Sequence, residues 1–201
     1  MTATPAIRLS AFVGPTEAPA VEDAARRLTE ALAAAGAPAS AVQVEFVASL
    51  GELRDRALTD VAIVSLLPEV EAALRDWPAA EARLMRKYAA LARRLDAELL
   101  FLCTVFRHAP TDLDEDARIA LQIAIRRLDL LAVHVSHATG LNVIDLDRAF
   151  AHVGALSLET DYRLTGEAAT EAAGAVIAAA VLEAGLEDRV SAPAAAGTNG
   201  A

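Results

Sequence analysis

Residues 99–106 read Leu99-Leu100-Phe101-Leu102-Cys103-Thr104-Val105-Phe106. The run is continuous and largely apolar, with no regular alternation of polar side chains. This pattern is typical of a parallel strand that helices cover on both faces. We therefore predict that it lies in the middle of a parallel sheet. Its Cys103 is the single cysteine of the chain, which excludes an internal disulfide and a cysteine-cluster metal site and fits a reducing compartment.

Further strand-like segments alternate with helical segments on both sides of this run. The predicted strands are residues 7–13, 42–47, 61–64, 99–106 and 141–146, and the predicted helices are 18–35, 50–58, a helix that begins at 77–78, 112–138 and 166–184. Because parallel neighbours need a crossover, we predict an α/β fold, a three-layer α/β/α sandwich with a five-stranded parallel sheet in the flavodoxin-like order 2-1-3-4-5. Residues 1–188 are expected to form one domain, and residues 189–201 a disordered tail.

The composition restricts the classes of partner. The chain has 201 residues with 28 acidic and 18 basic side chains, a formal net charge of −10, which disfavours binding to nucleic acid and to anionic lipid. The apolar stretch 172–182 is shorter than the roughly 20 residues that a bilayer requires, so no membrane span is expected. No export signal is recognisable, and we predict a cytoplasmic protein.

Ligands of doubly wound sheets bind beyond the carboxyl ends of the strands, here in the loops after the strands and before the last helix. Neither G-x-G-x-x-G nor G-x-x-x-x-G-K-[ST] occurs, so no nucleotide cofactor is predicted. His134 and His137 lie three residues apart on one predicted helix and could share a metal, but no third ligand is evident. We interpret this pair as structural and predict no metal site.

Three groups of polar side chains fall in these loops, and each has two interpretations. Thr16 presents its hydroxyl to a ligand, or else Thr16 or Glu17 caps the first helix. Arg107-His108 offers an oxyanion partner and a base, or ties down the acidic segment 112–116. Asp145 and Asp147 are expected to cap the following helix and to pair with Arg148.

Four segments carry a resemblance to a known family. They are Leu9-Ser10-Ala11-Phe12-Val13-Gly14-Pro15-Thr16, Val61-Ala62-Ile63-Val64-Ser65-Leu66-Leu67-Pro68-Glu69, Val143-Ile144-Asp145-Leu146 and Thr160-Asp161-Tyr162-Arg163-Leu164-Thr165-Gly166-Glu167-Ala168-Ala169. In order and spacing, over about residues 7 to 185, the chain resembles the SGNH (GDSL) hydrolases. The resemblance implies esterase, lipase or carbohydrate acyl-transfer chemistry at this sheet edge.

The resemblance also assigns roles to residues, and the chain departs from the family at each motif. The Gly-Asp-Ser turn of the family resembles Gly14-Pro15-Thr16, which places Thr16 at the serine position. The Gly-x-Asn-Asp turn corresponds to Leu67-Pro68-Glu69, which has neither glycine nor asparagine. The Asp-x-x-His pair corresponds to Thr160-Asp161-Tyr162-Arg163, and an arginine cannot accept a proton near neutral pH.

Two functional hypotheses follow, and the partner expected is a small-molecule or carbohydrate ligand, or a protein partner in the second. The first is a divergent ester hydrolase or acyltransferase that acts on an acylated carbohydrate, with Thr16 as nucleophile and His108 replacing the missing base. In this hypothesis Asp161 or Glu69 orients His108, and Arg107 or Arg163 stabilises the oxyanion.

The second hypothesis is a catalytically inactive pseudoenzyme. It keeps the fold and binds an anionic ligand or a protein partner through Arg107, Arg163 and Arg148. A third and weaker option is a homodimerising scaffold that uses the alanine-rich last helix.

Overall fold

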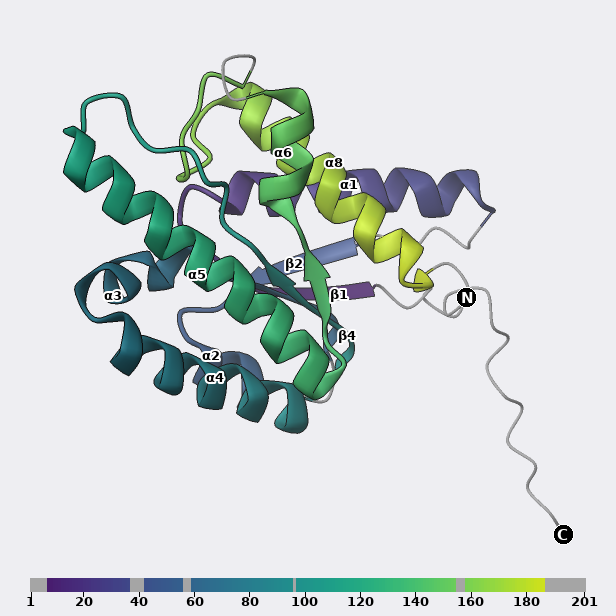
Figure 1. Cartoon of the computed structure of the whole chain (residues 1–201). Coiled ribbons are helices and arrows are strands. Elements are labelled where there is room, and N and C mark those ends of the chain that lie inside the picture. Colours follow the sequence, from purple (N-terminus) through teal and green to yellow (C-terminus); the bar gives the residue numbers. More distant parts are fainter. Residues whose placement is uncertain (1–6, 37–41, 56–58, 96, 155–157, 187–201) are drawn as a thin grey trace, which may run out of the picture.

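The computed structural model describes residues 7–36, 42–55, 59–95, 97–154 and 158–186. The expected tail, residues 189–201, lies outside them. The described strands form one parallel sheet in the order β2-β1-β3-β4-β5 (Figure 1). They are β1 (Ile7–Phe12), β2 (Val42–Phe46), β3 (Thr59–Ser65), β4 (Ala97–Cys103) and β5 (Asn142–Ile144). The predicted fold class and strand order are thus confirmed, with β3 and the largely apolar β4 inside the sheet.

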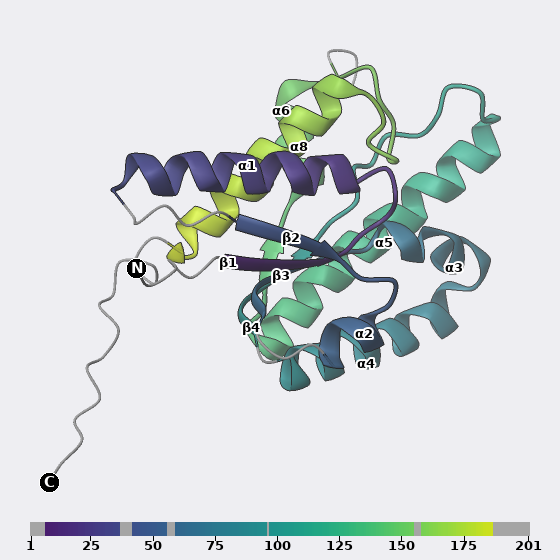
Figure 2. The ribbon, with the colours of Figure 1, turned by 180° about the vertical axis from the view of Figure 1, so that it is seen from behind.

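Helices cover both faces of the sheet. They are α1 (Ala18–Ala34), α2 (Leu50–Asp55), the 3-10 turn η1 (Leu67–Glu69), α3 (Val70–Arg75), α4 (Trp77–Arg94), α5 (Glu115–Thr139), α6 (Leu146–Val153) and α8 (Glu167–Glu183). Figures 1 and 2 show α1, α6 and α8 on one side and α2, α3, α4 and α5 on the other. Successive residues of β3 point to opposite faces, so Val61 packs in the core under α1 and α8, and Ala62 in the core under α4 and α5.

Local sequence signals fix several helix ends. The Asp114 carboxylate accepts a hydrogen bond from the backbone N–H of Ala117 at 2.8 Å, so α5 begins three residues later than its predicted start. Gly140 ends the same helix with φ of 78°, a conformation that glycine adopts without steric cost. The Asp145 carboxylate caps α6 by accepting from the N–H of Arg148 at 2.9 Å, as expected.

Two predicted strands are too long, and short helices were missed. β4 ends at Cys103, because the N–H of Val105 donates to the Asp129 carboxylate of α5 at 2.9 Å instead of continuing the ladder. β5 ends at Ile144, and Leu146 begins α6. Residues 67–69 were expected to form a loop and 70–75 were given no helix, because short helices carry little periodicity; α6 was expected only as the helix that Asp145 caps.

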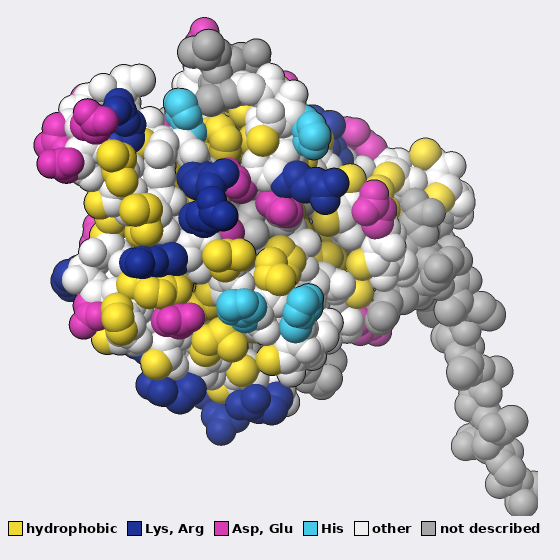
Figure 3. Space-filling model, viewed as in Figure 1, with side chains coloured by type: hydrophobic (Ala, Val, Ile, Leu, Met, Phe, Trp, Pro, Cys, Tyr) yellow, Lys and Arg dark blue, Asp and Glu magenta, His cyan; other side chains and the backbone are white. Residues whose placement is uncertain are grey.

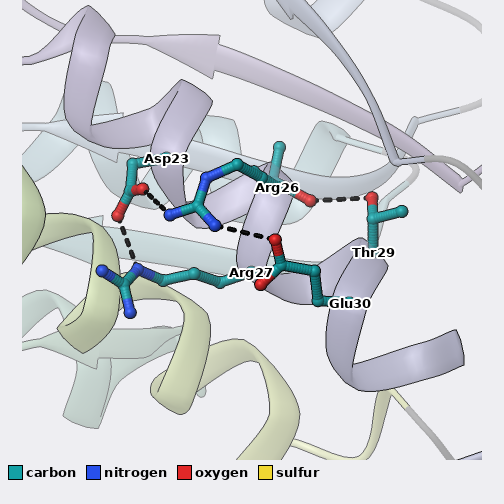
Figure 4. Close-up of polar contacts among 6 residues, drawn as sticks. Asp23, Arg26, Arg27, Thr29 and Glu30 are labelled. Atoms are coloured by element: carbon teal, nitrogen blue, oxygen red, sulfur yellow. Dashed lines mark hydrogen bonds and ion pairs between the residues drawn. The ribbon is translucent and has the colours of Figure 1, made fainter. Parts of the chain in front are cut away.

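The last helix packs on the first. The small residues of α8 that face the interior include Ala173 and Gly174, and a Cβ at position 174 would clash with the Asp23 carboxylate of α1. Figure 4 shows how Asp23 is held by Arg26 and Arg27 of its own helix. This face of α8 is covered by α1, so the structure does not offer it for the dimer contact suggested by its composition.

In the described part of the chain, no helix combines the length and the apolar composition needed to cross a membrane.

Candidate functional site

A cavity of about 590 Å³ opens between the loop that follows β4 and the segment that precedes α8. Both segments lie at the end of the molecule where α5 and α8 begin (Figure 1). Most of its lining residues are of polar type; they are His108, Ala109, Pro110, Thr111, Asp112, Glu159, Thr160, Asp161, Arg163 and Thr165. Three of the residues predicted from the sequence, His108, Asp161 and Arg163, therefore share one cavity.

His108 joins the two walls of this cavity. Its carbonyl oxygen accepts a hydrogen bond from the N–H of Tyr162 at 2.8 Å, which ties the loop after β4 to the segment before α8. Its ring stacks on Phe106, with centroids 5.8 Å apart, and Phe106 meets Phe150 of α6 edge to face at 5.1 Å. The imidazole is thus held by the apolar core beneath it.

The Asp161 carboxylate is bound by Arg163 on two of its sides. Its Oδ1 accepts from the backbone N–H and from Nε of Arg163, both at 2.9 Å, and its Oδ2 accepts from the guanidinium. Partial burial acts to raise the pKa of Asp161, but the hydrogen bonds and charge of Arg163, helped by the charge of His108, lower it below its ordinary value. The site holds a carboxylate neutralised by arginine where the family pattern has a carboxylate paired with histidine.

The other predicted arginines do not line this cavity. The backbone N–H of Arg107 donates to the Asp147 carboxylate at 2.8 Å, and the guanidinium lies 3.6 Å from the same group. Arg107 therefore pairs with α6, and not with the acidic segment 112–116, while Asp147 pairs with Arg107 instead of Arg148. Arg148 is exposed on α6. Of the three arginines in the pseudoenzyme hypothesis, Arg163 alone lines this cavity.

Glu69, predicted to orient a base or bind a ligand, is a buried carboxylate that forms ion pairs with partly exposed cations of α4. Its side chain is 8% exposed and contacts Lys87, the guanidinium of Arg83 at 3.3 Å and the hydroxyl of Tyr88 at 3.4 Å. Burial, followed by the charge of Glu69, raises the pKa of Tyr88 well above its ordinary value. Side chains of α4 supply the hydrogen-bond partners of this carboxylate, and Glu69 does not line the cavity.

The turn after β1 contains a feature that sequence reasoning missed. Thr16 is half-buried and is not among the residues that line the cavity, whereas Glu17 beside it is buried. The Glu17 carboxyl accepts hydrogen bonds from the N–H of Gly14 at 2.7 Å and from the hydroxyl of Ser65 at 2.6 Å. Glu17 occupies the N-cap position of α1, but its side chain makes no cap hydrogen bond to the helix, so the capping interpretation of that side chain is wrong. Burial raises the pKa of Glu17 to about 7, although both hydrogen bonds act to lower it.

Glu17 and Ser65 occupy backbone donors of the two turns in which the family resemblance places the nucleophile and the oxyanion donors. The N–H of Gly14 is bound to Glu17, and the Ser65 hydroxyl oxygen accepts from the N–H of Leu67 at 3.0 Å. Pro68 has no N–H, and the N–H of Glu69 donates to the carbonyl of Leu66 at 3.0 Å. No sequence signal pairs Glu17 with a serine 48 residues away, because only packing of β1 against β3 brings them together.

The described residues include no group of three His, Cys, Asp or Glu side chains placed to hold a metal ion. His134 and His137 are both exposed on the carboxyl-terminal half of α5, away from the strand ends.

No protein-family model matches the sequence, and no curated protein matches it. Several solved structures, however, have a similar fold. A lipase/acylhydrolase from Enterococcus faecalis has a TM-score of 0.64 at 18% identity, over 91% of this chain and 96% of that one. An acetyl xylan esterase has a TM-score of 0.59 at 13% identity, over 87% of this chain and 100% of that one.

A protein classed as an SGNH hydrolase, from Slackia heliotrinireducens, has a TM-score of 0.54 at 12% identity, over 90% of this chain and 100% of that one. At these identities the likeness is one of fold. The chain has the fold of the SGNH hydrolases, as its resemblance to that family implied.

Proposed function

We propose that this chain is a ligand-binding protein on the SGNH hydrolase fold that does not run the family's ordinary acyl-transfer reaction. We further propose that its ligand is a small, hydroxyl-rich molecule of the carbohydrate class. The observation that carries the first statement is the Glu17–Ser65 contact, because these two side chains occupy the N–H groups of Gly14 and Leu67. Donors of this kind stabilise the oxyanion in acyl transfer.

The remaining catalytic groups support the same conclusion. A hydroxyl without a neighbouring base is a weak nucleophile, and Thr16 does not line the cavity that contains His108 and Asp161. The Asp161 carboxylate is bound by Arg163. Loss of one oxyanion donor alone costs about 10²–10³ in rate, so the combined departures remove most of the expected acceleration.

The charges of the cavity indicate what it binds. Asp112, Glu159 and Asp161 contribute three carboxylates, against one guanidinium from Arg163, which Asp161 already neutralises. This excess of negative charge favours a neutral or cationic ligand over the anionic ligand of the pseudoenzyme hypothesis. Carboxylates and the hydroxyl of Thr111 are suited to accept hydrogen bonds from sugar hydroxyls. The acetyl xylan esterase among the similar structures, a carbohydrate esterase by name, adds support for this ligand class.

The competing function is ester hydrolysis by Thr16, His108 and Asp161, which is favoured by the shared cavity of the last two. A p-nitrophenyl acetate assay separates the two. We expect the wild type and Thr16→Ala to give the same background rate. A rate well above background that Thr16→Ala abolishes would establish the hydrolase and overturn our proposal.

Ligand binding is tested by isothermal titration with xylose, N-acetylglucosamine and glucose 6-phosphate. We expect a neutral sugar to bind more strongly than the phosphate, and Asp112→Asn to weaken that binding at least about tenfold, as loss of a charged hydrogen-bond partner does. Arg75→Gln is the control, because Arg75 is exposed on α3 and does not line the cavity. Neutral-sugar binding that Asp112→Asn leaves unchanged would exclude this cavity as the site, and preferential binding of the phosphate would overturn the ligand class.

A further inference from the structure

The outward face of α5 carries large apolar side chains that the fold leaves in solvent. Ile119, Ile123, Leu130 and Val133 are 46%, 45%, 51% and 41% exposed. Figure 3 shows hydrophobic side chains following the course of α5 across the front of the molecule. Single exposed apolar residues are common on proteins, but a row of them along one helix is typical of an interaction surface.

The spacing of this row is that of a helix-packing seam. Positions 119, 123, 126, 130, 133 and 137 are separated by four, three, four, three and four residues, the alternation of the two core positions of a coiled coil. The opposite face of α5 is already buried against the sheet and α4, through Leu121, Ala124, Ile125, Leu128, Leu131, Ala132 and Val135. The helix is therefore apolar on two faces, of which the monomer uses one.

We propose that the outer face of α5 is a dimer interface, on which α5 of a second copy packs antiparallel about a two-fold axis near Arg126. This register is self-complementary. It places Ile123 opposite Leu130 of the second copy, and Ile119 opposite Val133 of the second copy, so each large apolar side chain meets another. Two-fold symmetry then repeats both pairs on the other side of the axis.

The acidic first turn of α5 and the helix dipole favour antiparallel packing against a second copy of the chain. The amino-terminal turn of α5 carries Glu115 and Asp116, and the carboxyl-terminal turns carry His134 and His137. Figure 3 shows acidic side chains toward one end of α5 and a pair of histidines toward the other. Antiparallel packing sets acids against histidines and opposes the two helix dipoles, whereas parallel packing sets acids against acids.

Arg126 lies at the centre of the seam. Its neighbour Arg127 is directed to α4, where the guanidinium lies 5.8 Å from the ring of Trp77. A polar residue at one seam position lowers the stability of a helix pair while fixing its register. We therefore expect Arg126→Leu to strengthen the dimer.

Sedimentation of the full chain across a range of concentrations tests the proposal. We expect the wild type to approach twice the monomer mass of 21.0 kDa, and Leu130→Asp to remain monomeric. Val153→Asp is the matched control, because Val153 is 50% exposed on α6, and it should dimerise like the wild type. Circular dichroism checks that Leu130→Asp stays folded. A wild type that is monomeric throughout, or a dimer that Leu130→Asp leaves unchanged, overturns the proposal.

Disulfide trapping tests the orientation. Cys103 is 2% exposed, so an added cysteine on α5 reports on the interface alone. We expect Arg126→Cys to cross-link to itself under oxidation. Leu130→Cys should not, because the two copies of position 130 lie roughly 10–12 Å apart at 1.5 Å per residue, beyond disulfide reach. Efficient cross-linking through Leu130→Cys would show a parallel pair and overturn the antiparallel register.

Discussion

Replacement of Glu17 by glutamine should change how the stability of the protein depends on pH. Burial raises the pKa of Glu17 from its ordinary value of 4.5 to about 7. Glutamine has the same size and can accept from the N–H of Gly14 while donating to the hydroxyl oxygen of Ser65. Glu17→Gln therefore removes the ionisation and keeps both contacts.

The sign and size of the effect follow from the pKa shift. The folded protein holds the Glu17 proton between pH 4.5 and about 7, where the unfolded chain has released it. The wild type thus loses stability as pH rises through this range, and the variant does not. A shift from 4.5 to about 7, at about 1.4 kcal/mol per pKa unit, amounts to roughly 3 kcal/mol.

Urea unfolding of the wild type and Glu17→Gln, at several pH values between about 4 and 8.5, measures this difference. Because other groups titrate equally in both proteins, only the difference in unfolding free energy is interpreted. We expect it to grow in favour of Glu17→Gln by roughly 3 kcal/mol as pH rises, or about 6–12 °C in Tm. A difference that is constant with pH would refute the burial of an ionisable carboxyl at this turn.

Further predictions concern packing and helix ends. Phe150→Ala should lower the free energy of unfolding by about 3–5 kcal/mol, since this ring is fully buried between α6 and the sheet, and a loss below about 1 kcal/mol in urea unfolding would argue against that packing. Gly174→Ala should cost about 1–3 kcal/mol because its Cβ meets the restrained Asp23, and the double variant with Asp23→Ala should recover part of the loss measured by thermal melts. Asp114→Ala should cost about 1 kcal/mol by removing the cap of α5, with Asp114→Ser close to the wild type in the same melts.

Most of the fold could be predicted from the sequence. The apolar run that becomes β4 and the alternation of strands with helices predict a parallel sheet, and right-handed crossovers restrict its order. The errors fall at element ends and in short helices. The predicted strand 141–146, for example, contains Asp145, whose carboxylate caps α6 and so ends the strand. A side chain that bonds to the backbone competes with strand pairing, and local periodicity does not report that competition.

Less of the candidate site could be predicted. The loops after the strands were identified from topology, and His108, Asp161 and Arg163 do line one cavity. The sequence did not show that Asp161 would be bound by Arg163, nor that Arg107 would be drawn to Asp147. Competition among neighbouring charges decides such pairings, and it depends on distances of a few ångströms.

What the sequence determined by itself is the class of architecture and the edge of the sheet that carries the candidate site, because hydrophobic periodicity and the geometry of parallel crossovers act over short stretches of chain. The tertiary structure alone decided which hydrogen bonds the polar groups at that edge make and which of them are buried. It brought Glu17 against Ser65, buried the carboxyl and occupied the donors of both turns. It also left a second apolar face of α5 in solvent. Burial and contacts between distant segments are properties of the packed chain, so no local pattern of residues specifies them.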